Sequence, residues 1–534
     1  MIRLTEIRLP LDHLDTALNE AISERLSLAP ENIIDYAIFR RGYDARKRNK
    51  VVLVYTLDVS VKDENDVLNL NQSKPNIKPS PDTSYKMLAH APENIQARPI
   101  VIGTGPCGIL AALLLAQMGF KPIILERGKI VRERTKDTFA LWRERKLNTE
   151  SNVQFGEGGA GTFSDGKLHS QIKDPNNYGR KVLTEFVKAG APDEILYVSK
   201  PHIGTFKLVG MVEKIREEIE SLGGEFYFSS KVEKLVLENQ QVKGVELSDG
   251  TVFHSEHVVL AIGHSARDTF QTLLDQGVYI EAKPFSIGFR VEHPQSMIDK
   301  VRFGENAGHP MLGAADYKLV HHCKDGRSVY SFCMCPGGTV VAATSEENRV
   351  VTNGMSQYSR NERNANSAVV VGITPEDFPG GPLAGLDFQR ELESRAFVMG
   401  GKNYNAPAQL VGDFLANKTS TKLGAVTPSY TPGVELTNLE CALPAFAIEA
   451  LREAIPVFDK KLKGYASHDA VLTGVETRTS SPVCVKRDAT FQSINTPGLY
   501  PAGEGAGYAG GILSAAVDGI KIAEAVAIAM LAKS

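Results

Sequence analysis

The feature that most constrains the fold is a short apolar strand that runs directly into a glycine-rich turn and an apolar helix. The strand is 99–102, the turn is 103–108, and the helix continues to Met118. A second apolar strand follows at 122–126 and ends in an acid. This order of strand, G-x-G-x-x-G turn, helix, strand and acid is typical of dinucleotide-binding units. The sequence therefore predicts an α/β domain built on a parallel sheet.

Each glycine of this unit has a separate physical role. Gly103 permits the tight turn, Gly105 lets the backbone approach a pyrophosphate, and Gly108 lets the helix pack closely on the strand. The phosphates are expected at the helix N-terminus, where free N–H groups favour anions. Glu126 is placed to bind ribose hydroxyls, and its charge would repel a 2′-phosphate. The neighbouring residues predicted to join this contact are Pro106, Cys107, Arg127 and Gly128.

Length and charge exclude several classes of protein. A chain of 534 residues is too long for one compact core, and a formal net charge of -3 argues against a dedicated nucleic-acid binder. The six scattered cysteines do not form a disulfide framework. No secretory signal or membrane span is visible, and the apolar stretch 512–532 is interrupted by charges. We expect a cytoplasmic protein.

The pattern along the chain predicts three structural units. Residues 1–75 are predicted to be a small α+β domain of ferredoxin-like type, and 76–97 a polar linker. Alternating strands and helices in 98–280 indicate the first part of the dinucleotide-binding domain. Residues 281–470 are predicted to be an inserted substrate domain. The second part of the dinucleotide-binding domain is expected in 471–534.

A second glycine-rich block lies at 156–167. Such glycine density lets backbone N–H groups approach an anion or a planar ring closely. Phe155, Phe163 and Leu168 anchor the block, which disfavours a freely moving surface loop. We therefore predict that it covers the cofactor, through Gly158, Gly159, Ala160, Gly161, Thr162, Ser164 and Asp165.

Two later segments carry a family resemblance. Residues 498–512 run from a strand through a glycine-rich turn into a long helix, and 258–263 is an apolar strand that ends in Ala-Ile-Gly. Together with the first motif they resemble the glutathione-reductase-like flavoproteins, whose fold is a three-layer α/β FAD/NAD(P)-binding (Rossmann-like) domain. The resemblance implies that an acid after the last strand binds the ribityl chain, although the family more often has Asp there. The residues implied to bind the cofactor are Val232, Ala261, Gly263, Gly503, Glu504, Gly511 and Ile512.

The whole chain resembles a bacterial family of FAD-dependent dehydrogenases of unassigned substrate. The blocks that carry this resemblance are 152–168, 332–338 and 476–482. No second strand-GxGxxG-helix unit follows the first, so a separate nicotinamide domain is not predicted. The resemblance implies FAD as the cofactor and hydride transfer between a small organic substrate and flavin N5. NADH or NADPH would then serve at most as a transient reductant.

Cys333 and Cys335 are two candidate catalytic thiols on a predicted strand. Alternation along the strand places them on one face with Ser331, with Cα atoms roughly 7 Å apart, too far for an unstrained disulfide. His321 to Cys323 lie nearby, but the spacing matches no standard zinc finger. Two readings remain open, which are packing thiols and a redox or substrate-lining role.

Glu476 and Arg478 lie in a run of polar residues that is unusual for a central strand. A strand that is polar on both faces must meet water or a ligand, so Arg478 is a candidate for neutralising a substrate carboxylate or the reduced flavin. The alternative is a structural pair between Glu476 and Arg478. His202 and His264 lie near cofactor segments, but a lone histidine is more often structural.

Two other functions remain possible. A flavin monooxygenase would use the same cofactor arrangement. An RNA-associated flavoprotein, or a scaffold that binds flavin without catalysis, would use the basic turn at 40–50, which is the densest charge cluster of the chain. The net charge disfavours nucleic acid as a partner.

Overall fold

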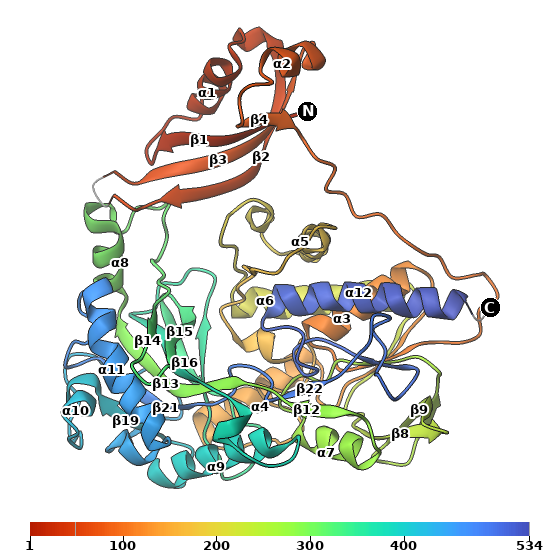
Figure 1. The fold of residues 1–534 in the computed structure, drawn as a ribbon, viewed down its shortest axis with the longest axis vertical. Helices are drawn as coiled ribbons and strands as arrows, with labels where there is room; N and C mark the ends of the chain where they lie inside the picture. The colour runs from red at the N-terminus through yellow and green to blue at the C-terminus, as the bar shows by residue number, and fades with distance from the viewer. Residues whose placement is uncertain (48–49, 533–534) are drawn as a thin grey trace.

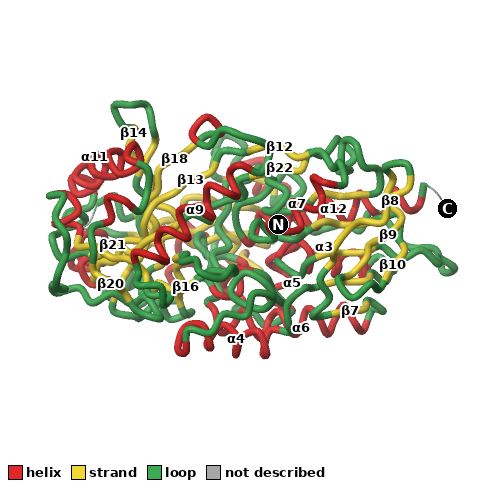
Figure 2. The backbone as a smooth tube through the Cα atoms, turned by 90° about the horizontal axis from the view of Figure 1, so that it is seen from below, coloured by secondary structure: helices red, strands yellow, loops and turns green. Residues whose placement is uncertain are grey.

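The computed structural model describes residues 1–47 and 50–532. Residues 48 and 49, in the basic turn at 40–50, lie outside the described residues. A small N-terminal unit stands above a larger body, and an extended chain joins the two (Figure 1). The body itself has two halves, each with its own sheet, which lie side by side in the orthogonal view (Figure 2).

The N-terminal unit has the order βαββαβ, with a four-stranded sheet in the order β2-β3-β1-β4. This is the split βαβ arrangement. Strand β3 alternates buried and partly exposed residues, because one face of the sheet packs on the helices. Strand β4 pairs with β1, so the unit extends past residue 75 and the linker is shorter than predicted. The elements are β1 (Ile2–Pro10), α1 (Ala17–Leu26), β2 (Ile33–Asp44), β3 (Val52–Val61), α2 (Glu64–Leu70) and β4 (Ile77–Pro79).

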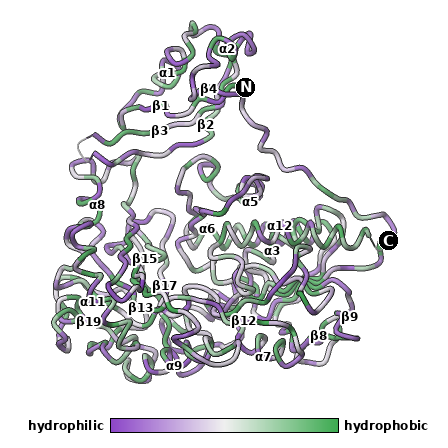
Figure 3. Tube along the Cα trace, viewed as in Figure 1, coloured by the Kyte–Doolittle hydropathy of each residue, from purple (hydrophilic) through white to green (hydrophobic). Residues whose placement is uncertain are grey.

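The first half of the body is a three-layer α/β domain. Its parallel sheet has the order β23-β11-β5-β6-β7, and its central strands are fully buried. Helices α3 and α12 pack against each other on one face, where both are mainly hydrophobic (Figure 3). An antiparallel sheet, β10-β9-β8, forms the third layer. The Rossmann-like fold predicted from the sequence is confirmed.

The elements of this domain follow in chain order. They are β5 (Ile100–Ile102), α3 (Pro106–Gln117), β6 (Ile123–Leu125), α4 (Val131–Glu144), α5 (Tyr178–Lys188), α6 (Thr205–Ser221), β7 (Glu225–Tyr227), β8 (Val232–Glu238), β9 (Gln241–Leu247), β10 (Val252–His254), β11 (Val258–Leu260), α7 (Arg267–Asp275), β22 (Val483–Val485), β23 (Leu499–Pro501) and α12 (Ile512–Leu531). A short strand, β12 (Ile280–Ala282), pairs with β22 where the chain leaves and re-enters the domain.

The second half of the body is built on a seven-stranded sheet in the order β14-β15-β18-β13-β21-β19-β20. Strand β21 lies in the middle of this sheet, so the boundary predicted at 470/471 is wrong, and the chain returns to the first half only after Glu476. The elements are β13 (Phe285–Pro294), α8 (Gln295–Phe303), β14 (Val320–His322), β15 (Ser328–Cys335), β16 (Gly338–Ala342), β17 (Thr352–Ser356), β18 (Asn364–Ile373), α9 (Ala384–Met399), β19 (Ala406–Leu410), α10 (Val411–Leu415), β20 (Val434–Leu436), α11 (Ala445–Lys461) and β21 (Val471–Glu476).

The N-terminal unit is docked on the body through strand β2. The backbone N–H of Arg41 donates to the carbonyl of Tyr197 at 2.6 Å, and the N–H of Ser199 donates to the carbonyl of Arg41 at 2.8 Å. Tyr43 packs edge-on against Phe303 of the inserted half. These contacts fix the unit beside the segment that leads into the site. Within 1–47 and 50–532, the structure contains no helix that is long and apolar enough to cross a membrane.

Candidate functional site

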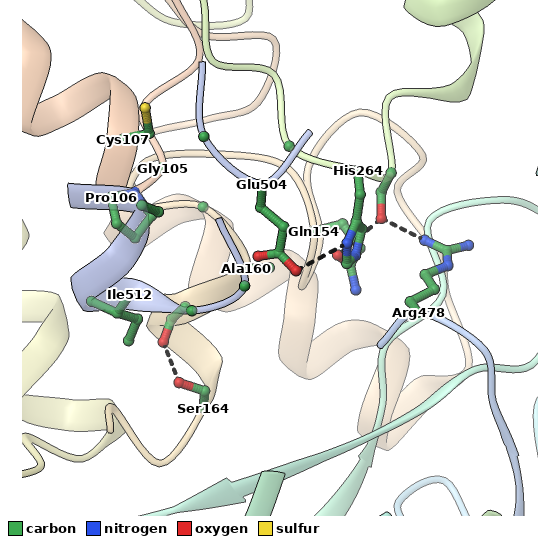
Figure 4. Close-up of a pocket in the computed structure, with 18 of the residues that line it drawn as sticks. Gly105, Pro106, Cys107, Gln154, Ala160, Ser164, His264, Arg478, Glu504 and Ile512 are labelled. Atoms are coloured by element: carbon green, nitrogen blue, oxygen red, sulfur yellow. Dashed lines mark hydrogen bonds and ion pairs between the residues drawn. The ribbon is translucent and has the colours of Figure 1, made fainter. Parts of the chain in front are cut away.

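A cavity of about 820 Å³ lies between the two halves of the body. Its size is that of a pocket for a cofactor together with a small ligand. One end is formed by the glycine turn after β5, and the other reaches the inserted sheet at Phe332 and Cys333. The close-up shows Pro106, Glu504, His264 and Arg478 along this wall (Figure 4).

The glycine turn is packed on every side but one. A Cβ on Gly103 would collide with the carbonyl oxygen of Ala261, and one on Gly108 would collide with that of Gly103. A Cβ on Gly105 would meet no neighbour closer than the Cα of Gly159, at 3.8 Å. Gly105 therefore faces open cavity beside the N-terminus of α3, where free N–H groups attract phosphate.

Glu126 joins the two glycine-rich segments of the site, 103–108 and 156–167, by hydrogen bonds to their backbone. We call these two segments together the cradle. Its carboxylate accepts hydrogen bonds from the N–H and hydroxyl of Thr104, at 3.0 and 2.7 Å, and from the N–H groups of Gly128 and Gly156, at 2.9 and 3.0 Å. Glu126 thus joins the first glycine turn to the second glycine block. Its side chain also lines the cavity, so its predicted contact with a ribose stays a prediction.

Arg134 holds the second glycine block, and sequence reasoning missed it. Its guanidinium is fully buried and donates to the carbonyls of Asn152, Val153 and Glu157 at 2.7–2.8 Å. Burial lowers the pKa of Arg134 to about 10. The Glu157 carboxylate in turn accepts from the backbone of Val131 and from Arg216. A single charged residue in a helical pattern carries no sequence signal for this role.

The turn after β23 is held in place by Asp518 and Arg487. The N–H of Gly503 donates to Asp518 at 2.8 Å, and Arg487 makes a bidentate pair with the same carboxylate. Glu504 projects toward the cavity, with an oxygen 3.4 Å from Nδ1 of His264 (Figure 4). This arrangement leaves the N-terminus of α12 open to the cavity.

Most predicted cofactor residues meet in this one cavity. Those in its wall are Gly103, Gly105, Pro106, Cys107, Glu126, Arg127, Gly159, Ala160, Gly161, Ser164, Asp165, Val232, Ala261, Gly263, Gly503, Glu504, Gly511 and Ile512. Gly108, Gly128, Gly158 and Thr162 lie behind the wall and support it. His264 is in the wall, whereas His202 is not and bonds to the carbonyl of Tyr358.

Arg478 lies in the wall but its partner is not Glu476. Its side chain, 4% exposed, makes two hydrogen bonds to Glu393, at 3.0 and 3.1 Å, and bonds to the hydroxyls of Ser265 and Ser345. Glu393 is fully buried and also pairs with Arg267. Although burial opposes ionisation, the two guanidinium groups hold the pKa of Glu393 well below its usual range. The charge of Arg478 is therefore largely neutralised within the protein.

Glu476 pairs with Arg290 instead. Strand β21 ends at Glu476, so the polar run beyond it is a loop and not the predicted strand. The Glu476 carboxylate accepts from Arg290 at 2.6 and 3.0 Å and from the Thr352 hydroxyl at 3.0 Å. Glu476 lines the cavity, whereas the fully buried Arg290 lies behind it.

The two thiols of β15 do not follow simple alternation. The register with β18 shifts between Phe332 and Cys335, and Cys333 has a φ of 44°. This is a β-bulge, which breaks the period of two. The predicted regular alternation of Ser331, Cys333 and Cys335 on one face is therefore wrong, and the Cys335 thiol donates to the backbone carbonyl of Cys333 at 3.4 Å. Cys333 lines the cavity, and Cys335 is buried behind it.

The far end of the cavity carries an excess of positive charge. Asp165 makes a bidentate pair with Arg360 and lies 3.4 Å from the Lys167 ammonium. Asp316 pairs with Lys200 at 2.7 Å. Lys318 also lines the cavity and makes no hydrogen bond or ion pair within the described part of the chain. Lysine and arginine thus outnumber the carboxylates at this end.

The cradle fits a dinucleotide that carries a flavin. Open space beside Gly105 and two helix N-termini are suited to a pyrophosphate, and the cavity continues beyond them with room for a ring system.

Residues 284–479 match the family described as "FAD-dependent protein, C-terminal domain-like", and residues 1–60 match a domain of unknown function.

A relative from Clostridium beijerinckii decides the family. This uncharacterised protein is 51% identical over 525 residues, which cover 98% of each chain. The chain belongs to the family of this protein. Within that family the matched domain is FAD-dependent and the cradle fits the cofactor, so FAD is the cofactor.

Solved structures at low similarity include CtdE and a glycine oxidase. CtdE in complex with FAD is 12% identical, with a TM-score of 0.31 over 80% of this chain and 82% of that one. Glycine oxidase from Bacillus cereus is 11% identical, with a TM-score of 0.32 over 81% of this chain and 97% of that one. Scores this low carry no functional inference.

Proposed function

We propose that this protein is an FAD-dependent oxidoreductase that moves a hydride between flavin N5 and an anionic small organic substrate. When bound, FAD supplies the hydride chemistry. The observation that carries the proposal is a single cavity that runs from a glycine cradle to a wall rich in lysine and arginine. The resemblance to glutathione-reductase-like flavoproteins is part of the proposal, and the meeting of its separate segments in one cavity supports it.

The charges at the far end support an acidic substrate. The carboxylates Asp165, Asp316 and Glu476 are already paired, and Lys318 has no partner within the described residues. A carboxylate or phosphate entering here would find a cation whose charge is not neutralised by the protein. His169 lines the same end, and its pKa is lowered, first by burial and then by Lys200, Arg40 and Lys318. Neutral His169 therefore accepts a proton less readily than a free histidine does.

The N-terminal unit contributes to this entrance. Arg40 lies near enough to lower the pKa of His169, and the adjacent Arg41 is bonded to the segment 197–199 that leads into Lys200. We propose that the unit forms part of the substrate entrance. A cytoplasmic location is also proposed, and it is supported by the finding that all six cysteines are free.

The test uses purified full-length protein under argon. NADH, NADPH and a panel of organic acids, each matched with its neutral amide, are screened for bleaching of the flavin absorbance. Bleaching by acids but not by their amides is the expected result. Reduction by neutral compounds alone would overturn the anionic substrate, and rapid NAD(P)H oxidation that needs both oxygen and a phenolic substrate would favour a monooxygenase. Release of FMN or NAD in place of FAD on denaturation would contradict the cofactor assignment.

A further inference from the structure

The bulge in β15 brings two free cysteines together beside the flavin cavity. One extra residue on β15 is accommodated between the pairs Phe332–Ala368 and Cys335–Asn366. At Cys333 the backbone takes a left-handed φ of 44°, which is costly for a residue with a side chain. The thiol of Cys335 also reaches the carbonyl of Cys333, at 3.4 Å. Bending of this kind shortens the span between positions that are too far apart on a regular strand to bridge.

Positive charge surrounds this pair. The Lys167 ammonium lies 3.8 Å from Sγ of Cys335, and Arg290 donates to the carbonyl of Cys333 at 3.1 Å. The Cys335 thiol, followed by Lys167 and Arg290, lowers the pKa of Cys333, although burial opposes this shift. The pKa of Cys335 is raised instead. One thiol of the pair is thus favoured as the thiolate, and the other keeps its proton.

Another cavity cysteine lacks these features. Cys107 lies in the cofactor cradle, but burial raises its pKa. No second cysteine and no lysine contacts its thiol within 1–47 and 50–532. The Cys107 thiol is therefore expected to be inert, in contrast to Cys333.

We propose that Cys333 and Cys335 are a redox-active pair that exchanges two electrons with the FAD. In the oxidising direction, the two thiols lose two protons and two electrons and form one S–S bond, and oxidised FAD accepts both electrons. In the reverse direction, reduced FAD returns two electrons, the S–S bond breaks, and two protons restore the thiols. Cys333, which faces the cavity, is the exchanging thiol, and Cys335 is the one that closes the disulfide.

This pair gives the protein a second store of electrons beside the flavin. A substrate that delivers one electron pair would then leave either the flavin or the dithiol reduced, according to their relative potentials. The inference depends on FAD binding but not on the identity of the substrate. Its test can therefore fail while the proposed reaction stands.

The experiment is an anaerobic reductive titration of the full-length holoprotein. The protein is first oxidised with ferricyanide, freed of reagent and titrated with dithionite, while flavin absorbance and free thiols are followed. The wild type is expected to take up two electrons per FAD more than the flavin alone requires, and two thiols should appear during the titration. Mass spectrometry of the oxidised protein should show the peptide linkage between Cys333 and Cys335.

Serine variants test whether the two additional electrons are taken up by Cys333 and Cys335. Cys333→Ser and Cys335→Ser should each take up only the electrons of the flavin, whereas Cys441→Ser, at an exposed cysteine that does not line the cavity, should behave as the wild type does. If either buried variant fails to fold, the wild-type titration and the disulfide map still decide. A wild-type titration that ends with the flavin's own two electrons, with all six cysteines open to alkylation throughout, would overturn the proposal.

Discussion

The two ends of the cavity are built in different ways. The cofactor end consists mainly of backbone from glycine turns, and its positions follow from local sequence. Toward the inserted half the wall carries charged side chains whose partners lie behind it and are distant in the sequence, as in the pairs of Arg478 with Glu393 and of Glu476 with Arg290. The first end is therefore shaped by glycines that leave space open, and the second by charged side chains, of which Arg478 and Glu476 are paired within the protein whereas Lys318 has no partner within the described residues. Mutations in the glycine turns should therefore change the affinity for FAD, whereas mutations of the charged residues should change stability, flavin potential or anion affinity.

The largest effect is expected where neutralisation is most complete. Glu393→Gln removes the fully buried carboxylate that Arg267 and Arg478 share and leaves the partly exposed Glu346 as their remaining acidic partner within the described residues. Breaking a buried pair costs about 3–5 kcal/mol. The free energy of unfolding, measured in urea, should fall by that amount. Glu391→Gln is the matched control on the same helix, because Glu391 is exposed and its one ionic partner within 1–47 and 50–532 is Arg395. Equal losses in the two variants would show that burial of the cluster is unimportant.

The same carboxylate predicts a pH dependence. Because the pKa of Glu393 is lowered in the folded protein, its contribution is complete above the unfolded value of about 4.3 and is lost as pH falls through the lower folded value. Stability of the wild type should therefore decrease with acid below about pH 4.5, and Glu393→Gln should decrease less steeply. Chemical denaturation from pH 3 to pH 7 measures both slopes. Parallel curves would contradict this linkage.

At the cofactor end, adding a side chain to a glycine of the turn should weaken FAD binding without unfolding the protein. In Gly105→Val the new side chain enters the open space where we expect the pyrophosphate, while the nearest protein atom to its Cβ lies 3.8 Å away. Loss of about 3 kcal/mol of phosphate contacts weakens FAD binding on the order of 100-fold. Equilibrium dialysis measures the affinity, and thermal melting of the apoprotein tests the fold.

Gly210→Val is the control for this change. A Cβ at Gly210, on helix α6, meets no neighbour within 4 Å, and the residue is absent from the cavity wall. This variant should keep its flavin. If both variants lost FAD equally, a general effect of valine at glycine positions would explain the result, and the cradle would not.

The same contrast explains how much was predictable from the sequence. The turn from Gly103 to Gly108 depends on contacts within a few residues, so its motif predicts both the fold and the cofactor end. The partner of Arg478 is 85 residues away on another element, and no local pattern points to Glu393. The bulge at Cys333 was missed for a similar reason, because a regular alternation of side chains was assumed. The sequence pattern assigned strand β21 to the returning domain because the polar run that follows it does reach the cavity wall, at Arg478 and Thr479.

A smaller effect is expected at Arg478, because Glu393 already balances its charge. Arg478→Met should leave FAD bound, since the cradle does not depend on this residue. The flavin midpoint potential should fall by no more than about 30 mV, the equivalent of about 1.4 kcal/mol for a two-electron couple. Spectroelectrochemical titration measures it. A fall far beyond this limit would mean that the positive charge of Arg478 acts on the flavin directly, in spite of Glu393.

The smallest effect is expected at Lys318, which is exposed and unpaired within the described residues. An exposed cation contributes about 0.2–1 kcal/mol to an ion pair, so Lys318→Gln should weaken binding of sulfate by up to about fivefold. The affinity is measured from the rise in melting temperature with sulfate concentration at constant ionic strength, because a ligand that binds only the folded state raises stability. Lys324→Gln, at an exposed lysine that does not line the cavity, should leave the affinity for sulfate unchanged.

Because added salt screens exposed charges, the difference in sulfate affinity between the Lys318 and Lys324 variants should shrink as sodium chloride is raised. A difference that persists at high salt would show that the Lys318 ammonium makes a contact that salt does not screen, as is expected for the buried Glu393 cluster.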